Sequence, residues 1–470
     1  MCLQVSIYVL EYCKVCAVNL LSASTVTPGI FQHLTGMKSK LIVLAMTALL
    51  PIAVQAQKPA KTTTADVYTT DIDHFWVAYD AARRTSDTTE QQQIMQSMYI
   101  DKGSDGLKAF MKLRDYDAAL YVKLINKAPR FWNSIRPNTL TVKSQAPAIE
   151  RSISKLKKLY PEMRPAKMYF TIGGLRSGGT VMGDKVLVGA EIATGDEKTE
   201  ASELSAWLQD VFKNQKSDNL VGLNIHEYIH TQQKPNGTTL LSQSIREGSA
   251  DFISELVTGE LLNSSYAIYG RANESKLKAE FKIDMFSEGM SRWLYNGSDA
   301  DRADLGYFMG YSICKSYYNN APNKKKAIKD IIEVDYGDST AVYNFLLRSK
   351  YYPEVLDQTA LLKQYDALQP VVASLTPALD GRTDVDTATK TVTIHFSQPM
   401  AKKISISFGE SGRSHFPITE VVGFSDDMKS LTLRLSMVAN HDYEFLITGK
   451  SFQSQQGYAL KEYPVKFRTK

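Results

Sequence analysis

The spacing of apolar residues changes near residue 370, and this change divides the chain into two folding regions. Before that point, apolar side chains recur at three- and four-residue steps, as at Ile149, Ile153 and Leu156, which is the spacing of a helix face. After it they alternate with polar residues, as in Thr391–Phe396, which is the spacing of a half-buried strand. We therefore expect a mostly helical region, followed by an all-β sandwich over residues 369–470.

A short stretch rich in strand-forming residues interrupts the helical region. Lys167–Ile172 and Val186–Ala190 contain mainly β-branched, aromatic and other apolar residues, and two glycine pairs lie between them. This pattern predicts two strands and a small β-sheet, so the expected fold class is α+β. We expect Met168–Ile172 to be an edge strand that can pair with an extended peptide, with an ordinary hairpin as the alternative.

Residues 37–56 have the three parts of a secretory signal peptide. Met37–Lys40 is basic, Leu41–Val54 is apolar, and Val54–Ala56 is a small-x-small cleavage site. The apolar run is too short to span a membrane comfortably, so we expect an exported protein, periplasmic or secreted, with no transmembrane segment in the mature chain. In chain order we expect an N-terminal extension from a mis-called start (1–36), the signal peptide (37–56), a polar linker (57–66), the helical domain (67–368) and the sandwich (369–470).

Charge and cysteine content exclude some classes of protein. The formal net charge of +5 over 470 residues is close to neutral, which gives no electrostatic reason to expect nucleic acid as a partner. Cys314 is the one cysteine after the predicted signal peptide. A framework of disulfides is therefore excluded in the mature chain, although an exported protein could form one.

Residues 226–230 read H-E-x-x-H, a pattern of metal-dependent hydrolases. Residues four apart lie on one face of a helix, so His226 and His230 can hold one Zn²⁺ at about 2.0–2.1 Å. Glu227 would then face the same cleft without binding the metal, where it can deprotonate a water molecule as a general base. Apolar residues flank the run, which predicts a buried helix whose polar side chains need partners.

The third ligand must come from another segment, and Glu247 is the best candidate. It lies on the next predicted helix, beyond a turn at Lys234–Gly237 that would return the chain antiparallel to the first helix. Asp251 is one turn further along the same face, where it can accept the ring N–H of a ligand histidine. The alternative for Asp251 is a solvated helix carboxylate.

These residues also carry a family resemblance. H-E-x-x-H followed by a glutamate on the next helix resembles the gluzincin, or thermolysin-like, metallopeptidases. The local sequence at 226–230 and 247–252, together with Gly306-Tyr307-x-x-Gly310-Tyr311, resembles a bacterial family of predicted zinc-dependent proteases related to gliding-motility lipoproteins. This resemblance covers roughly residues 67–365 and implies a zincin-like domain. It implies zinc ligands His226, His230 and Glu247, with Glu227 as base and Asp251 behind the ligands. The C-terminal segment, which contains Phe396-Ser397-Gln398-Pro399-Met400, is similar to bacterial Ig-like domains of the kind found on envelope proteins.

The expected function is a zinc-dependent peptidase that acts on a peptide or protein substrate. Tyr307 and Tyr311 are candidate donors to the oxyanion that forms during hydrolysis, and a core tyrosine is the alternative for each. An envelope or surface partner is expected for the Ig-like domain. A non-catalytic zinc-binding protein of envelope assembly is the second hypothesis, and a zinc esterase or amidase would share the same chemistry.

Overall fold

The computed structural model describes residues 66–215, 219–297 and 303–470. The predicted extension, signal peptide and nearly all of the predicted linker lie outside these residues. Within them, no helix is both long enough and apolar enough to cross a membrane. Two separate hydrophobic cores form, one in the helical region and one in the C-terminal β region.

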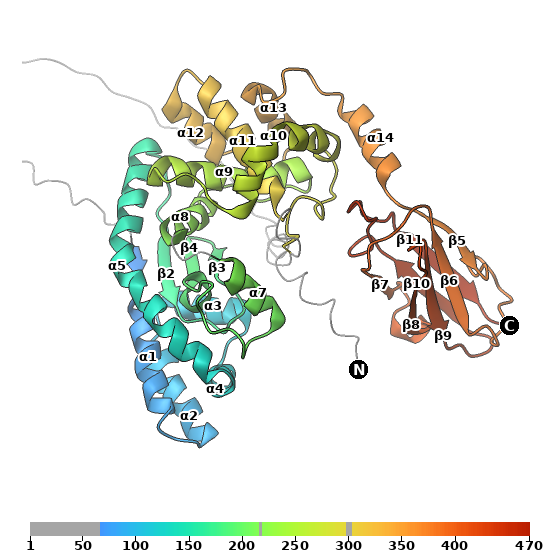
Figure 1. Ribbon diagram of the computed structural model, residues 1–470, viewed down its shortest axis with the longest axis horizontal. Coiled ribbons are helices and arrows are strands. Elements are labelled where there is room, and N and C mark those ends of the chain that lie inside the picture. The colour runs from blue at the N-terminus through green and yellow to red at the C-terminus, as the bar shows by residue number, and fades with distance from the viewer. Residues whose placement is uncertain (1–65, 216–218, 298–302) are drawn as a thin grey trace, which may run out of the picture. The chain divides into compact units, whose positions relative to one another are not determined.

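Helices and strands follow the predicted division into a helical and a β region (Figure 1). The helices are α1 (Thr70–Ala82), α2 (Thr88–Met95), α3 (Asp105–Arg114), α4 (Ala118–Lys127), α5 (Pro129–Leu159), α6 (Ala190–Ala193), α7 (Ala206–Asn214), α8 (Leu220–His230), α9 (Leu240–Thr258), α10 (Ser265–Asp284), α11 (Leu305–Asn320), α12 (Lys324–Ile332), α13 (Ser339–Ser349) and α14 (Gln358–Leu368), with a π-helix η2 (Gln96–Ile100) and a 3₁₀ helix η4 (Arg413–His415). The strands are β1 (Asp66–Tyr68), β2 (Lys167–Thr171), β3 (Gly179–Met182), β4 (Lys185–Gly189), β5 (Val372–Thr376), β6 (Thr391–Phe396), β7 (Ile406–Phe408), β8 (Ile418–Phe424), β9 (Ser430–Leu435), β10 (Asp442–Ile447) and β11 (Tyr463–Arg468).

The small sheet of the helical region has the strand order β1-β2-β4-β3. β2 is parallel to both of its neighbours, β1 and β4, whereas β3 runs antiparallel to β4. The expectation that Met168–Ile172 forms an edge is therefore wrong, because β2 is paired on both sides. Among the described strands, β1 pairs with β2 alone and β3 pairs with β4 alone, so both are edge strands of the sheet. β3 also contacts α8.

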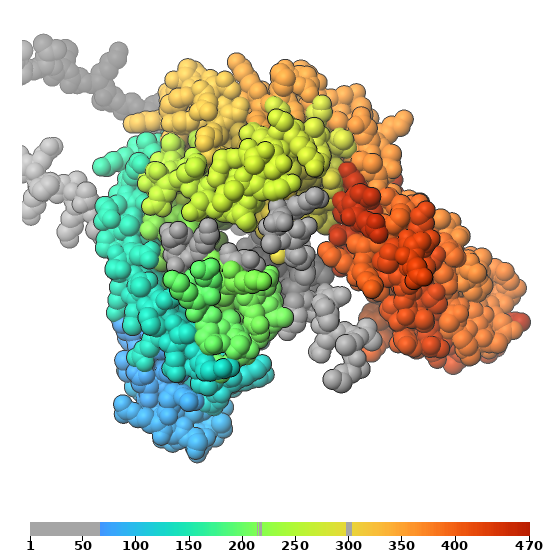
Figure 2. All heavy atoms as spheres, viewed as in Figure 1, coloured from blue at the N-terminus to red at the C-terminus, as the bar shows by residue number. Residues whose placement is uncertain are grey.

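Helices pack around this sheet and carry the candidate site. α1 and α3 contact β2, and the long α5 contacts β1, α8 and α9. Figure 1 shows α5 running beside the sheet and α8. Side chains of α5 and α7, in cyan-green and green, form much of the face seen in Figure 2.

Helices α9 and α11 approach each other more closely than ordinary side chains allow. A Cβ atom added at Gly248 would overlap the backbone of Gly310 and Tyr311, and one added at Gly310 would overlap the carbonyl group of Ser244. Glycine is required at both positions because the two backbones are in direct contact.

The C-terminal region consists of two antiparallel sheets. Their strand orders are β5-β6-β9-β8 and β11-β10-β7. Alternate residues of β6 and β9 are buried, including Val392, Ile394, Leu431 and Leu433, as the two-residue period predicts. These inward side chains form the second core.

Candidate metal centre

Helix α8 has a core side and a side that faces α9. Leu220, Ile225 and Ile229 are buried in the core of the helical region. His226 and His230 lie one turn apart, at the spacing that puts two side chains on one face. Because α8 packs directly against α9, both imidazoles can reach groups on the second helix.

Helix α9 places two carboxylates opposite these imidazoles. The helix begins after Thr239, whose hydroxyl oxygen accepts a hydrogen bond from the N–H of Ser242 at 3.2 Å. It ends at Gly259, which adopts the left-handed conformation with φ of 80°. Glu247 and Asp251 therefore lie one turn apart within a continuous helix, and both side chains are buried.

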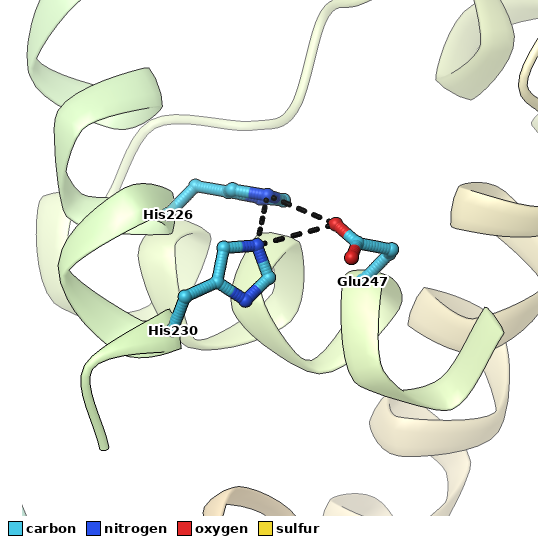
Figure 3. A group of neighbouring side chains, drawn as sticks. All are labelled: His226, His230 and Glu247. Atoms are coloured by element: carbon cyan, nitrogen blue, oxygen red, sulfur yellow. Dashed lines mark hydrogen bonds and ion pairs between the residues drawn. The ribbon is translucent and has the colours of Figure 1, made fainter. Parts of the chain in front are cut away.

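His226, His230 and Glu247 converge on one point, as Figure 3 shows. The Nε2 atoms of the two histidines are 3.0 Å apart. Oε2 of Glu247 lies 3.4 Å from Nε2 of His226 and 3.2 Å from Nε2 of His230. The three side chains are only 10%, 8% and 7% exposed.

These separations fit a tetrahedral metal ion. Zinc with bonds of about 2.0–2.1 Å holds its ligand atoms roughly 3.3–3.4 Å apart. The measured separations of 3.0, 3.2 and 3.4 Å are close to this value. Two imidazole nitrogens and one carboxylate oxygen are also a donor set that suits zinc, and a fourth position would remain for water or substrate. The assignment of these residues as zinc ligands stays a prediction.

Asp251 fixes the orientation of His226. Oδ1 of Asp251 lies 2.7 Å from Nδ1 of His226. A carboxylate only accepts, so Nδ1 donates this bond and neutral His226 keeps its lone pair on Nε2. The hydroxyl of Tyr266 on α10 donates to the other oxygen, Oδ2, at 2.8 Å. The alternative of a solvated helix carboxylate is wrong for Asp251, because it is buried and both oxygens are bonded.

A neutral amide supports the second histidine. Oε1 of Gln233 lies 2.6 Å from Nδ1 of His230. Nε2 of Gln233 donates to the carbonyl oxygen of Arg246 at 2.8 Å and to Oγ of Ser249 at 2.7 Å. The Arg246 guanidinium in turn bonds Oε1 of Glu247 at 2.8 Å, which leaves Oε2 to face the two imidazoles.

Neighbouring charges move the pKa values of His226 and Glu247 in opposite directions. Burial alone would lower the pKa of His226, but the charge and hydrogen bond of Asp251, with the contribution of Glu247, raise it to about 10. Burial alone would raise the pKa of Glu247. The His230 charge, the bonds to both histidines and the Arg246 charge instead hold this pKa well below its ordinary value. The three donor atoms therefore favour a positive charge between them, which either a proton or a metal ion can provide.

Glu227 lies between the two histidines in sequence and beside β3 in space. A Cβ atom added at Gly179 would lie 3.7 Å from Cγ and 3.8 Å from Oε1 of Glu227. The glycine backbone at the free edge therefore passes close to this carboxylate. Within the part of the chain that the structure describes, no side chain or backbone group forms a hydrogen bond with the Glu227 carboxylate. This carboxylate is therefore available to a water molecule or substrate.

The two candidate tyrosines of α11 lie in different places. The ring of Tyr307 stacks on His226, with ring centres 6.1 Å apart and an angle of 22° between planes. Burial and the Glu247 charge hold the pKa of Tyr307 well above 10, so its hydroxyl stays a donor. Tyr311 instead donates to both carboxylate oxygens of Glu255, at 2.9 and 2.8 Å. The structure does not bring Tyr311 to the metal centre, which corrects that assignment.

Three side chains that support the site were not predicted from the sequence: Gln233, Arg246 and Tyr266. Gln233 follows His230 by three residues, a spacing that could have indicated a partner on the same side of the chain. Arg246 directly precedes Glu247, and its charge next to a predicted ligand was a further signal. Tyr266 lies on a separate helix, and no local pattern relates it to Asp251.

Comparison with known proteins identifies the C-terminal region. Residues 366–469 match the family described as bacterial Ig-like domain, which confirms the prediction for the sandwich. No curated protein matches the chain.

The chain also shows similarity to crystal structures of an S-layer protein. One is rSbsC(31-844), at 11% identity over 85% of this chain and 45% of that chain, with a TM-score of 0.17. Another is the N-terminal part of the S-layer protein SbsC, at 12% identity over 85% of this chain and 71% of that chain, also with a TM-score of 0.17. The chain spans less than half the length of the first of these. A TM-score of this size carries no argument about fold or function.

Proposed function

We propose that this protein is an exported, zinc-dependent peptidase. One observation carries the proposal: two imidazoles and a carboxylate converge within 3.4 Å, and the unbonded carboxylate of Glu227, on the helix that carries both imidazoles, lies beside Gly179 of the edge strand β3. A purely structural metal site would not need such a carboxylate. A hydrolase needs one to take a proton from water.

His226, His230 and Glu247 would hold the zinc ion. Zinc, when bound, supplies Lewis acidity that acidifies water and polarises a carbonyl group. Glu227 accepts the proton of the attacking water and later delivers it to the departing amine. Asp251 and Gln233 keep the two rings in place during this cycle, so little reorganisation accompanies the reaction.

The edge of β3 is the proposed binding surface for the substrate backbone. An extended peptide can add to an open strand through main-chain hydrogen bonds. Gly179 has no side chain to obstruct that approach next to Glu227. Tyr307, stacked on His226, is the proposed donor to the oxygen that becomes negatively charged.

Export is part of the proposal, and two features support it. The segment at residues 37–56 has the composition of a signal peptide, and the C-terminal region matches a bacterial Ig-like domain. We propose that this domain contacts a partner in the cell envelope or on the surface. The same match favours a second candidate function, a zinc-binding envelope protein without turnover.

Substitution of Glu227 separates the two candidates. The full chain would be purified with zinc, its metal content measured by mass spectrometry, and peptide libraries incubated with wild type, Glu227→Gln and Glu260→Gln. The last is a matched control, since Glu260 is an exposed glutamate outside the site.

A peptidase is expected to lose at least 10²-fold in rate with Glu227→Gln while its zinc content is retained, and Glu260→Gln is expected to match wild type. Zinc without hydrolysis of any library by wild type supports the second candidate. Cleavage of ester or amide substrates but not of peptides would reassign the substrate class.

A further inference from the structure

We propose that Gln233 is a positioning residue that fixes the proton of His230 on Nδ1 and so directs the Nε2 lone pair at the metal position. This inference deepens the proposed function and rests on it for the identity of the metal. Some atoms around the amide can donate a hydrogen bond and others can only accept one, and this difference fixes both the amide and the imidazole.

The orientation of the Gln233 amide follows from its contact with a backbone carbonyl. One end of the amide lies 2.8 Å from the carbonyl oxygen of Arg246. A carbonyl oxygen accepts hydrogen bonds and donates none, so the end facing it must be the NH₂ group. The reverse orientation would place two acceptor oxygens in contact.

Ser249 adds a second constraint in the same direction. Its Oγ donates its single proton to the carbonyl oxygen of Arg246 at 2.9 Å. It therefore has only lone pairs to offer Nε2 of Gln233, at 2.7 Å. The hydroxyl of buried Tyr336 lies 3.2 Å from the same oxygen. Both protons of the Gln233 amide are thus directed at acceptors on α9.

The proton of His230 can then be assigned. Oε1 of Gln233 faces Nδ1 of His230 at 2.6 Å, and an amide oxygen cannot donate. Nδ1 must carry the proton of this bond, so neutral His230 has its lone pair on Nε2. That atom faces Nε2 of His226 and Oε2 of Glu247. The protein therefore presents His230 in its metal-binding tautomer before any metal arrives.

The two histidines are supported by different chemistry. Asp251 places a negative charge behind His226, whereas Gln233 places a neutral dipole behind His230. Gln233 also joins the end of α8 to α9 through the carbonyl of Arg246, the residue whose guanidinium bonds Glu247. A single buried amide thereby relates the position of the second histidine to that of the third ligand.

The test compares Gln233→Met, Gln233→Glu and Gln232→Met in the full chain. Methionine fills similar space but cannot accept from Nδ1 of His230. Glutamate can accept from Nδ1, as Asp251 does for His226, but it cannot donate to the carbonyl of Arg246 or to Ser249, so it separates the contact with His230 from the contacts with α9. Gln232 is a matched control: it is also buried, but it bonds the backbone of Arg164 and not an imidazole.

Zinc affinity would be measured by competition with a chromophoric chelator, and the Nδ1–H proton of His230 by NMR of the zinc-loaded protein. Gln233→Met is expected to weaken zinc binding about 10–100-fold and to lose the slowly exchanging Nδ1–H signal. Gln233→Glu is expected to retain the signal, with a zinc affinity between those of Gln233→Met and wild type, because it keeps the contact with Nδ1 but loses the two bonds donated to α9. Gln232→Met is expected to bind zinc like wild type.

The proposal is overturned if Gln233→Met keeps wild-type affinity, or if Gln232→Met weakens zinc binding equally. It is also overturned, together with the metal centre, if the wild-type chain takes up no zinc. Zinc binding that depends on Gln233, in a protein that hydrolyses no peptide, would support this inference while contradicting only the proposed peptidase activity.

Discussion

Both regions have an apolar core, but the helical region also buries many polar side chains along α9. In the C-terminal sandwich, inward positions of β6 and β9 hold Val392, Ile394, Leu431 and Leu433, all fully buried. In the helical region, α9 buries acidic and hydroxyl side chains along its length, and most of them hydrogen-bond to specific partners. Apolar contacts are non-directional, so many side chains can satisfy them, whereas buried polar groups require specific atoms at specific distances. The apolar contacts of the sandwich therefore tolerate a change of side chain, whereas the buried polar groups of α9 depend on particular partners.

Removal of zinc is expected to give the largest difference between the regions. A ligand present at 1,000 times its Kd stabilises the folded state by about 4 kcal/mol, and here only the helical region would gain. All four tryptophans, Trp76, Trp132, Trp207 and Trp293, lie in that region. Tryptophan fluorescence during urea unfolding should therefore show a lower midpoint after chelation. Hydrogen exchange in β6 and β9 should remain the same, and a change there would contradict the separation of the two cores.

Truncation of an apolar side chain tests the opposite region. Leu433→Ala should destabilise the sandwich by about 3 kcal/mol, because it removes a fully buried side chain and leaves a cavity. Arg434→Ala, at an exposed position of the same strand, is the control. Zinc affinity should be the same in both variants, as measured by chelator competition. A weaker affinity in Leu433→Ala would show that the two regions are energetically coupled.

Glu191 provides a pH-dependent test of polar burial. This fully buried carboxyl accepts hydrogen bonds from the N–H groups of Gly173 and Leu175, and burial raises its pKa from 4.5 to about 7. The folded state thus holds the proton more tightly than the unfolded state. The resulting stability is fully present below pH 4.5 and is lost as pH rises through about 7.

Wild type should therefore lose on the order of 3 kcal/mol from this group between pH 4.5 and pH 8. Glu191→Gln cannot ionise and should lose less over the same interval. Urea unfolding of both proteins at each pH, followed by tryptophan fluorescence, measures the difference. Parallel pH dependence in the two proteins would contradict the assignment.

The smallest expected effects on stability come from two glycine substitutions, one in each region. Gly310→Ala should destabilise the helical region by about 2 kcal/mol, because the new methyl group meets the backbone of Ser244. Helix propensity alone predicts the opposite sign, a gain of about 1 kcal/mol. Gly381→Ala in the sandwich should cost about 1 kcal/mol through its φ of +75°, with open space around it. A stabilising Gly310→Ala would refute direct contact between α9 and α11.

The same contrast explains which parts of the fold could be predicted from sequence. β6 was predicted because the alternation over Thr391–Phe396 marks a half-buried strand. β3 was missed because Gly178 and Gly179 favour a turn, and only pairing with β4 makes this segment a strand. β8 was missed because most of its side chains are exposed at a sheet edge and show no apolar alternation.

The candidate site, like the fold, could be predicted from the sequence only in part. His226, His230, Glu247 and Asp251 could be placed together because helical spacing relates each pair along its own helix. The position of Tyr311 could not, because its direction depends on how α11 packs on α9, and there its hydroxyl reaches Glu255. Partners on other segments, such as Tyr266, are determined by tertiary packing and leave no local pattern.

The burial of α9 has a consequence for the order of assembly. Most of its 19 residues are buried, so this helix is in place only after its neighbours have packed around it. Two histidines on an isolated α8 would form a weak, incomplete chelate, and the third donor arrives with the rest of the domain. Under the proposed function, metal uptake would therefore follow folding, unlike in a zinc finger, where the ion drives the chain to fold. The proposed export could then deliver a folded apoprotein, which would acquire its ion outside the cytoplasm.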